Sequence, residues 1–308
     1  MTQTSSHQPA GSAPVLVLAA GGTVAGATLD ELRRRDVAVR ALVRRPRPAD
    51  DPGIEWVVGD LRDPGVLTAA LRGVRTVLYV TPHENDETAM ADLVVRATRA
   101  AGVRLVFVGV HVSTRTVRGW LLHHVFRLLL PAYVPKLKIG RMVERTLPDA
   151  ALVVPSNFYD NDLTFLTDIE AGEYPTPIRR VNRVAVSDIA EVCADALTDP
   201  AFPAGTHGVS GPASLSGEES AAAWAEALGR PVRYVGNDPE AWEAALCRGI
   251  PEGKRRRDWR NSFRALGRMS MKTSPRDVEE TTRLLGRPPL DYRSWVAAQV
   301  RSRAEVGS

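Results

Sequence analysis

Residues 19–26, AAGGTVAG, have the composition and spacing of a phosphate-binding turn. Small residues recur in the pattern AxxGxxA, at Ala19, Gly22 and Ala25. The first lets the chain turn, the second lets backbone N–H groups approach a pyrophosphate, and the third lets a helix pack closely on a sheet. N–H groups at a helix N-terminus bind an anion without help from a side chain. We therefore predict that this turn, with Ala19, Gly21 and Gly22, contacts a dinucleotide.

Arg44 and Arg45 end a second apolar run, residues 37–43, in the region about 20 residues beyond the turn. An NAD-selective site places a carboxylate there, where it bonds the ribose 2′-hydroxyl group. No acid stands at that end of the run. A guanidinium group can instead pair with a 2′-phosphate, so the sequence favours NADP over NAD. The alternative is that both arginines are solvated residues of an arginine-rich loop.

Asp60 and Leu61 follow the apolar run 55–58. In an open parallel sheet this position faces the ligand crevice, so the Asp60 carboxylate could accept a hydrogen bond from an adenine amino group while Leu61 covers the ring. Asp60 or Asp63 could equally cap the helix that begins next. The residues leave these two interpretations open.

His111 and Tyr133 are candidate proton donors. His111 follows the run 105–110 and can titrate near neutral pH, which suits a general acid, although a structural histidine is the more common case. Tyr133 lies three residues before Lys136, but Pro135 intervenes and disfavours a common helical face. The sequence contains no Tyr-x-x-x-Lys motif.

Apolar runs and helical patterns alternate along the first half of the chain. The expected strands are residues 15–18, 37–43, 55–58, 76–80, 105–110 and 152–155. The expected helices between them are residues 28–35, 66–71 and 86–101, the last capped by Gly102. This alternation predicts a doubly wound parallel (Rossmann) α/β sheet, whose carboxyl edge collects the residues named above.

After Pro155 the pattern loosens, and a smaller mixed C-terminal lobe is expected. Its predicted strands are 184–186, 207–210 and 232–235, and its predicted helices are 188–197, 216–228, 239–246 and 277–285. We expect a flexible arm over 1–13, a nucleotide-binding domain over 14–155 and a substrate-binding lobe over 156–308. The strand near 184–186 is expected to rejoin the main sheet.

The longest apolar stretch is residues 120–134, between the fifth and sixth expected strands. It is shorter than the roughly 20 residues that a membrane span requires and it contains two histidines and an arginine, so we expect no membrane span. Long insertions at a ligand edge commonly become lids or contact surfaces. The same stretch could equally pack against a second copy of the chain, as in a homodimer.

Aromatic residues are expected to line the substrate side of the cleft. Asn157, Phe158 and Tyr159 follow the sixth strand, and Trp120 stands on the expected lid. Flat apolar side chains suit a hydrophobic, aromatic or polycyclic small molecule.

The composition excludes several classes of protein. The chain of 308 residues has a net charge of +4, an ordinary 44% of hydrophobic residues and only two cysteines, which excludes a disulfide framework and a cysteine-based zinc site. No metal site is indicated. The excess charge is small and spread out, so nucleic acid is not an expected partner, and the run 254–257 is interpreted as a solvated helix face. The first dozen residues lack the apolar core of a secretory signal, so a cytoplasmic location is expected.

Several segments together resemble the NmrA-like group of atypical short-chain dehydrogenases/reductases. They are VLVLAAGGTVAG, RALVRRP, VVGDLRDP, LTAALRGVRTVLYVTP, PSNFYDN, VAVSDIAEVCADAL and SPRDVEETTRLLGRPPLDYRSW, which occur in the family's order. The resemblance implies cofactor contacts at Gly22, Thr23, Val24, Arg44, Asp60, Leu61, Thr81 and Pro82. It also implies a catalytic lysine in one segment, where either Lys136 or Lys138 fits.

The chain departs from this family pattern at two places. Ala19 stands where the family usually has glycine, and its methyl group narrows the space expected for the pyrophosphate. Val110 and His111 replace the serine pair that typically ends the fifth strand.

These features favour an NADP(H)-dependent oxidoreductase that reduces a hydrophobic carbonyl or quinone. Two alternatives stay open. One is a nucleotide-sensing regulator without turnover, and the other is a non-redox enzyme, an isomerase, lyase or cyclase, that uses His111 and the lysines for proton transfer.

Overall fold

The computed structural model describes residues 13–46, 53–114, 116–129 and 133–306. All of the expected flexible arm except Ala13 lies outside these residues. Within them, two lobes are distinguishable, and each has its own apolar core.

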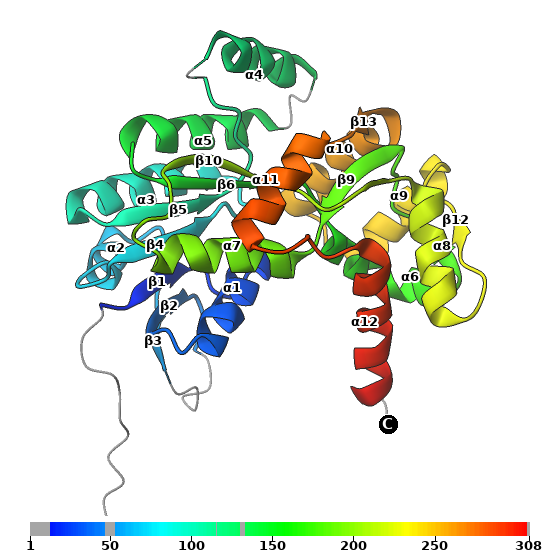
Figure 1. Cartoon of the computed structure of the whole chain (residues 1–308), viewed down its shortest axis with the longest axis horizontal. Helices are drawn as coiled ribbons and strands as arrows, with labels where there is room; N and C mark the ends of the chain where they lie inside the picture. The colour runs from blue at the N-terminus through cyan, green and yellow to red at the C-terminus, as the bar shows by residue number, and fades with distance from the viewer. Residues whose placement is uncertain (1–12, 47–52, 115, 130–132, 307–308) are drawn as a thin grey trace, which may run out of the picture.

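Seven parallel strands form the main sheet, in the order β10-β6-β5-β4-β1-β2-β3 (Figure 1). They are β1 (Val15–Leu18), β2 (Val39–Val43), β3 (Ile54–Val58), β4 (Thr76–Val80), β5 (Arg104–Val108), β6 (Ala151–Pro155) and β10 (Gly205–Val209). Val17 of β1 pairs with Ala41 on one side and with Leu78 on the other. The strand order reverses at β1, which confirms the expected doubly wound α/β fold and predicts a ligand crevice at the carboxyl ends of β1 and β4.

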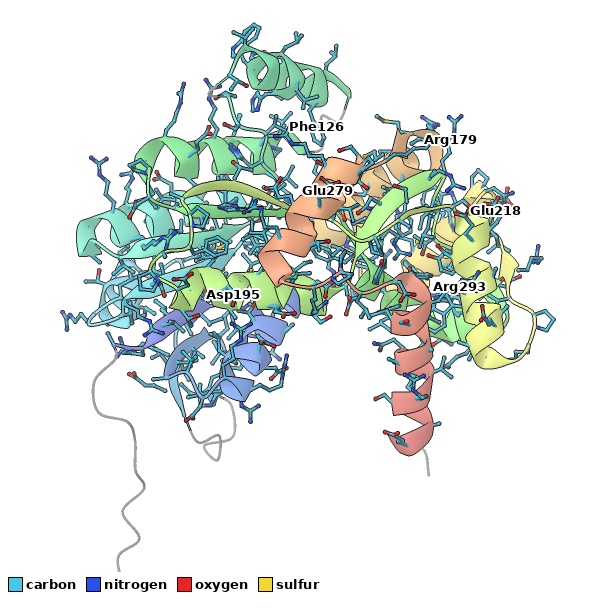
Figure 2. All side chains as sticks on the ribbon, in the orientation of Figure 1. Phe126, Arg179, Asp195, Glu218, Glu279 and Arg293 are labelled. Atoms are coloured by element: carbon cyan, nitrogen blue, oxygen red, sulfur yellow. The ribbon has the colours of Figure 1, made fainter. Side chains whose placement is uncertain are left out.

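Helices cover both faces of the main sheet. On one face lie α1 (Thr23–Arg34) and α7 (Val186–Thr198), and on the other α2 (Pro64–Ala70), α3 (Glu87–Ala101) and α5 (Val134–Thr146). α1 buries Val24, Leu29 and Leu32, which recur at helical spacing. Arg35 donates to Asp195 of α7 at 2.5 Å and joins the two helices, and Figure 2 labels Asp195 on α7 beside α1.

The C-terminal lobe is built around Trp224, which is completely buried. Its strands are β7 (Asn157–Phe158), β8 (Glu173–Tyr174), β9 (Arg180–Val184), β11 (Ser214–Leu215), β12 (Arg233–Tyr234) and β13 (Ser270–Met271). Its helices are η2 (Tyr159–Phe165), α6 (Leu166–Glu170), α8 (Gly217–Leu228), α9 (Pro239–Gly249), α10 (Lys254–Arg268), α11 (Pro275–Leu285) and α12 (Tyr292–Val306). β9 is the centre of a small sheet with β7, β11 and β13.

The chain returns to the main sheet at a different place from the one expected. The strand near 184–186 is β9, which ends at Val184 and pairs only with strands of the small sheet. The seventh main-sheet strand is instead β10, which runs parallel to β6, and α7 before it packs on α1. β10 contains Gly205, Thr206 and His207, so its apolar pattern is weaker than that of the valine-rich segment before α7. Residues 186–209 therefore belong to the same layers as residues 14–155.

The insertion after β5 contains α4 (Val117–Leu129), which projects from the body of the molecule above α5 (Figure 1). Within the described ranges, no helix combines the length and the apolar character that crossing a membrane would require.

Candidate functional site

The turn between β1 and α1 presents a helix N-terminus that no side chain caps. The N-cap residue is Gly22, and the first turn of α1 contains no acidic residue. The Gly26 N–H group donates to the Gly22 carbonyl at 2.7 Å, so the amides of residues 23–25 have no acceptor within the helix. In α2, α8, α9 and α11 a side chain closes this end: Asp63, Ser216, Asp238 and Ser274. An open N-terminus without acids fits a pyrophosphate.

Ala19 makes the sharp turn despite its side chain. Its φ is +52°, in the left-handed region that favours glycine. The methyl group packs against the apolar core that lies between the sheet and helices α2 and α3. The Gly22 amide donates to the Ala19 carbonyl at 3.0 Å and holds the turn closed. The substitution is therefore accommodated in the core, at a cost in backbone strain.

Arg44 follows β2 at the same edge of the sheet as the turn. Its side chain is 71% exposed, and Nη1 lies 3.5 Å from Glu84 Oε1, which follows β4. This weak surface pair leaves the guanidinium free to exchange Glu84 for a phosphate. Arg62, Asp60 and Asp86 stand beside it, and the hydrogen bonds from Arg62 hold the pKa of Asp86 below its usual value.

Asp60 and Asp63 have different roles at the end of β3. Asp63 is the N-cap of α2 and accepts from the Gly65 and Val66 amides. The Asp60 carboxylate instead accepts from the Arg62 amide at 2.9 Å, and Leu61 is buried in the core. The capping role therefore belongs to Asp63, while Asp60 remains partly exposed at the sheet edge.

Glu87 and two lysines meet where three helices begin. Glu87 starts α3 with only 3% of its side chain exposed. Lys136 Nζ of α5 lies 3.1 Å from Glu87 Oε2, and Lys254 Nζ of α10 lies 3.2 Å from Glu87 Oε1. The two lysine side chains are 10% and 17% exposed. One buried carboxylate thus joins the main sheet's helices to the C-terminal lobe.

Asp258 extends this cluster toward the solvent. Its carboxylate lies 2.6 Å from Lys254 Nζ and 2.8 Å from His83 Nδ1, in the loop after β4. Burial by itself raises the pKa of Asp258, but the bonds from His83 and Lys254 outweigh it and lower that pKa. For Lys254, burial alone lowers the pKa, and the pairing with Asp258 and Glu87 leaves it above its usual value. The cluster is therefore a charged chain of groups that runs from Lys136 to half-exposed His83.

Tyr133 and Thr81 border the same region. The Tyr133 hydroxyl shares a 2.7 Å hydrogen bond with Ser262 of α10, and burial raises the pKa of the phenol. Thr81 and Pro82 are half-buried just after β4, and the Thr81 amide donates to Val108 of β5 at 3.4 Å. Tyr133 is thus bonded directly to α10, and Lys136 is connected to α10 through Glu87 and Lys254.

Lys138, by contrast, is exposed on the outer side of α5, so the two candidate lysines have different surroundings. His111 is placed under the same helix. Its side chain is fully buried, with Nε2 3.5 Å from Glu144 Oε1. A side chain at Gly140 of α5 would come within 2.9 Å of the His111 ring, so only glycine permits this approach. Ser113 donates to Glu144 at 2.5 Å. His111 thus packs beneath α5 among internal partners, which agrees with a structural histidine.

Two of the expected substrate-side residues take part in the interior of the C-terminal lobe. Tyr159 is 1% exposed and its ring packs edge-on against Tyr292. Asn157 Oδ1 accepts from Arg183 Nε at 3.1 Å. Phe158 is partly buried against the core of the main sheet. With almost no surface exposed and its hydroxyl bonded to the Leu290 carbonyl, Tyr159 is a framework residue.

Arg183 holds the backbone of residues 157–159 in place through buried hydrogen bonds. It is completely buried and forms a two-point pair with Asp162, at 2.7 and 3.1 Å. It also donates to the backbone carbonyls of Phe158 and Tyr159. Asp162 accepts further hydrogen bonds from the hydroxyl groups of Tyr174 and Tyr292. The pair is therefore saturated with partners.

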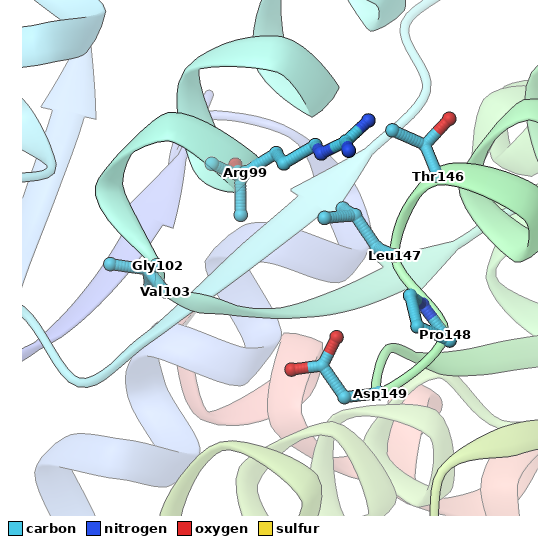
Figure 3. A pocket seen from close by; sticks show the side chains of 8 residues that line it. Arg99, Gly102, Val103, Thr146, Leu147, Pro148 and Asp149 are labelled. Atoms are coloured by element: carbon cyan, nitrogen blue, oxygen red, sulfur yellow. The ribbon is translucent and has the colours of Figure 1, made fainter.

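Trp120 lies apart from the groups described so far. It stands on the projecting α4 with half of its surface exposed, and its ring contacts His124 at a centroid distance of 4.2 Å. A depression of about 300 Å³ also lies elsewhere, between the C-terminal ends of α3 and α5 (Figure 3). Its lining includes Arg99, Gly102 and Asp149, at the amino edge of the sheet. It is therefore remote from the turn and from the lysine cluster.

Four members of the lysine cluster, Glu87, Lys254, Asp258 and His83, were not identified from the sequence. The basic run 254–257 was interpreted as a solvated face, but Lys254 is mostly buried and bonded to two carboxylates. The spacing of Lys254 and Asp258, one helical turn apart, is compatible with an ion pair. No local signal connects either of them to Glu87, which is 167 residues away in the chain.

Comparison with known proteins connects these features to nucleotide-dependent enzymes. Residues 19–200 match the model of a family described as NAD(P)H-binding. An NAD(P)H azoreductase from Xenophilus azovorans is 32% identical over 252 residues, which cover 77% of this chain and 82% of that protein.

Solved structures of similar fold include two reductases crystallised with a nucleotide. The Citrobacter sp. triphenylmethane reductase complexed with NADP(H) has a TM-score of 0.75 at 19% identity, covering 93% of this chain and 99% of that one. The Escherichia coli NADPH-dependent quinone oxidoreductase QOR2 complexed with NADPH has a TM-score of 0.73 at 17% identity, with coverage of 92% and 99%. At these identities the likeness concerns the fold.

Proposed function

Because this chain belongs to the NAD(P)H-binding family, and resembles its NmrA-like reductases in sequence, we propose that it is an NADP(H)-dependent reductase of hydrophobic aromatic acceptors. The acceptor classes are quinones, azo compounds and triarylmethane dyes. Each class is suggested by the name of a similar protein reported above: an azoreductase, a quinone oxidoreductase and a triphenylmethane reductase. All contain conjugated or aromatic rings; quinones and azo compounds accept a hydride and a proton, whereas a cationic triarylmethane dye accepts a hydride alone.

The observation that carries this proposal is the open N-terminus of α1 beside Arg44. The amides of residues 23–25 and the dipole of α1 provide an anion site without a side-chain competitor. Arg44, at the end of the adjacent β2, supplies a cation whose present pair with Glu84 is weak and exposed. A pyrophosphate at the N-terminus of α1 would accept hydrogen bonds from these amides. A 2′-phosphate beside Arg44 would pair with its guanidinium group.

The bound cofactor would supply the hydride, from its nicotinamide ring. The chain would supply the proton and the position of the acceptor. Lys136 is the group that we assign to the proton, because its Nζ is held by Glu87 at the start of α3, the helix that follows β4. The cluster beyond Glu87 reaches His83 at the surface, so Lys136 could be reprotonated from the solvent through Lys254, Asp258 and His83.

Arg44 gives the direct test of cofactor selection. NADPH and NADH are titrated by fluorescence into the wild type and into Arg44→Ala. We expect NADPH to bind 10- to 100-fold more weakly to the variant, since charge-assisted hydrogen bonds contribute about 1.5–3 kcal/mol, while NADH binding changes less than twofold. Arg230→Ala, an exposed arginine on the C-terminal lobe, is the matched control. Equal weakening of both nucleotides would contradict the 2′-phosphate assignment.

Turnover is measured separately, as loss of NADPH absorbance with benzoquinones, naphthoquinones, azo dyes and a triarylmethane dye. We expect reduction of at least one of these classes, with NADPH preferred over NADH. Tight NADPH binding with no turnover on any acceptor would instead favour a nucleotide-sensing regulator. Failure to bind either nucleotide would refute the proposal.

A further inference from the structure

Helix α4 carries its apolar residues on the outside. Its large exposed side chains are Val117, Trp120, Leu121, Leu122 and Leu128, which are 86%, 50%, 58%, 52% and 82% exposed. A helix on the surface of a water-soluble domain has the opposite arrangement, with its apolar stripe toward the core. Figure 1 shows α4 standing off the body of the molecule, so no other described element covers this face.

The angular positions of residues around α4 distinguish an outer side from an inner side that contacts the rest of the molecule. At about 100° per residue, Val117, Leu121 and Leu128 fall within a sector of about 40°. Exposed His124 and Trp120 border this sector on one side, and exposed Leu122 lies outside it. His123 and Phe126 lie on the opposite side: His123 is 2% exposed, and the Phe126 ring contacts Tyr133 edge-on. Figure 2 shows Phe126 on the side of α4 that faces the body. The helix is therefore attached by its inner side and presents an apolar outer side.

The charged residues of the chain segment that contains α4 have a single sign. The chain has no Asp or Glu from Leu93 to Val143, a stretch that contains nine arginines and lysines. The remaining chain consequently has an excess of acids. Arg127 lies next to Trp120 around the helix, at the border of the apolar face, and Lys138 of α5 is exposed below it. An amphipathic helix with apolar residues outward, tryptophan at the border and only basic charges has the composition of an interfacial membrane helix.

We propose that α4 binds the surface of an anionic phospholipid bilayer, with Val117, Leu121 and Leu128 inserted among the acyl chains and Arg127 at the headgroups. The 13 residues of α4 are too few to span a bilayer, but they are enough to lie in its interface. Lipid phosphates supply the negative charge that this segment of the chain lacks. A second copy of the chain fits less well, because two α4 faces in contact would bring two basic segments together, and neither contains an acid between residues 93 and 143.

The test is co-sedimentation of the full chain with vesicles of phosphatidylcholine alone and of phosphatidylcholine with phosphatidylglycerol at 3:1. We expect binding to the mixed vesicles at least tenfold tighter than to the neutral ones, and weakening as salt is added. Leu121→Asp/Leu128→Asp should abolish binding, and Arg127→Gln should weaken it about fivefold.

The control is Ala222→Asp/Ala244→Asp, which adds the same two charges at exposed positions of α8 and α9 and should bind vesicles as the wild type does. Circular dichroism and sedimentation velocity accompany each variant. The proposal is overturned if the wild type does not bind the anionic vesicles, or if both double variants lose binding equally. It is also overturned if the α4 variant turns a dimer into a monomer while vesicle binding is absent throughout. These outcomes do not depend on NADPH binding, so they are separate from the test of the reductase.

Discussion

Two clusters of buried charge hold this molecule together, and they differ in how completely they are satisfied. In the C-terminal lobe, the side chains of Arg183 and Asp162 are 0% exposed and are bonded to each other and to surrounding hydroxyl and carbonyl groups. At the sheet edge, Glu87 holds Lys136 and Lys254, both slightly exposed. The first cluster is closed to solvent, whereas the second continues through Asp258 to His83 at the surface.

The difference indicates two uses of a buried charge. A saturated pair fixes geometry, and here it fixes the backbone of residues 157–159 between the lobes. A cluster with a path to solvent can exchange protons while the fold stays intact. We therefore expect substitutions in the first cluster to change stability and substitutions in the second to change turnover.

The largest effect is expected from Arg183→Leu. Removing the guanidinium leaves the Asp162 carboxylate buried without its partner, which should lower the free energy of unfolding by about 3–5 kcal/mol. Urea denaturation monitored by circular dichroism measures the change. Arg180→Leu on the same strand breaks an exposed pair with Glu219 and should cost less than 1 kcal/mol.

The double variant Arg183→Leu/Asp162→Leu sharpens this result. If the cost comes from the unpaired carboxylate, the double variant should be more stable than Arg183→Leu alone. If it is equally or less stable, the stabilisation resides in the surrounding hydrogen bonds and not in the ion pair.

Lys136→Met should lower kcat about 100-fold with little change in KM, because general acid catalysis contributes about 10²–10⁴-fold. Stopped-flow and steady-state assays with NADPH and a reducible quinone measure it. Lys138→Met, two residues away and exposed, should remain within twofold of the wild type. Loss of thermal stability with unchanged kcat would assign Lys136 a purely structural role. Partial recovery of kcat in Lys136→Arg would show that the positive charge, and not proton transfer, is what turnover requires.

A smaller effect is expected on the stability that Asp258 contributes, because protonation at low pH weakens its bonds to Lys254 and His83. Its pKa is lowered in the folded state, so its stabilising contribution is present above its unfolded pKa and disappears as the pH falls through the lower folded value. Asp258→Asn should reduce the free energy of unfolding by about 1 kcal/mol at pH 7 and by almost nothing near pH 2. Asp30→Asn, at a highly exposed carboxylate of α1, is the matched surface control.

The smallest effect is expected at the phosphate turn. Ala19→Gly removes the strain of a left-handed backbone in the folded state but increases the conformational entropy of the unfolded chain. The first effect stabilises the fold and the second destabilises it, so the net stabilisation should be about 0.5 kcal/mol or less. Ala20→Gly, whose φ is not positive, should be destabilising instead. Thermal unfolding compares the two. Destabilisation by both substitutions would show that packing of the Ala19 methyl group outweighs the strain.

The parts of the fold that follow from local pattern were predictable from the sequence. Strand β1, the turn after it and the Gly102 cap of α3 are each specified by adjacent residues. The return of the chain at β10 was not: residues 207–210 were predicted as a strand of the C-terminal lobe, and their weak apolar pattern does not indicate a place in the main sheet. Most of the charged cluster at Glu87 was also missed, because its members meet only after three helices have packed.

The contact of β10 with β6 has a consequence for how this protein can be divided. A fragment ending at residue 155 would expose the edge of β6 and lose α7, leaving one face of the sheet covered by α1 alone. Such a fragment should aggregate when expressed by itself. The C-terminal lobe is formed by two separate chain segments, one on each side of residues 186–209, so recombination between relatives would have to exchange both segments at once. We therefore expect point substitutions to change substrate specificity more readily than recombination.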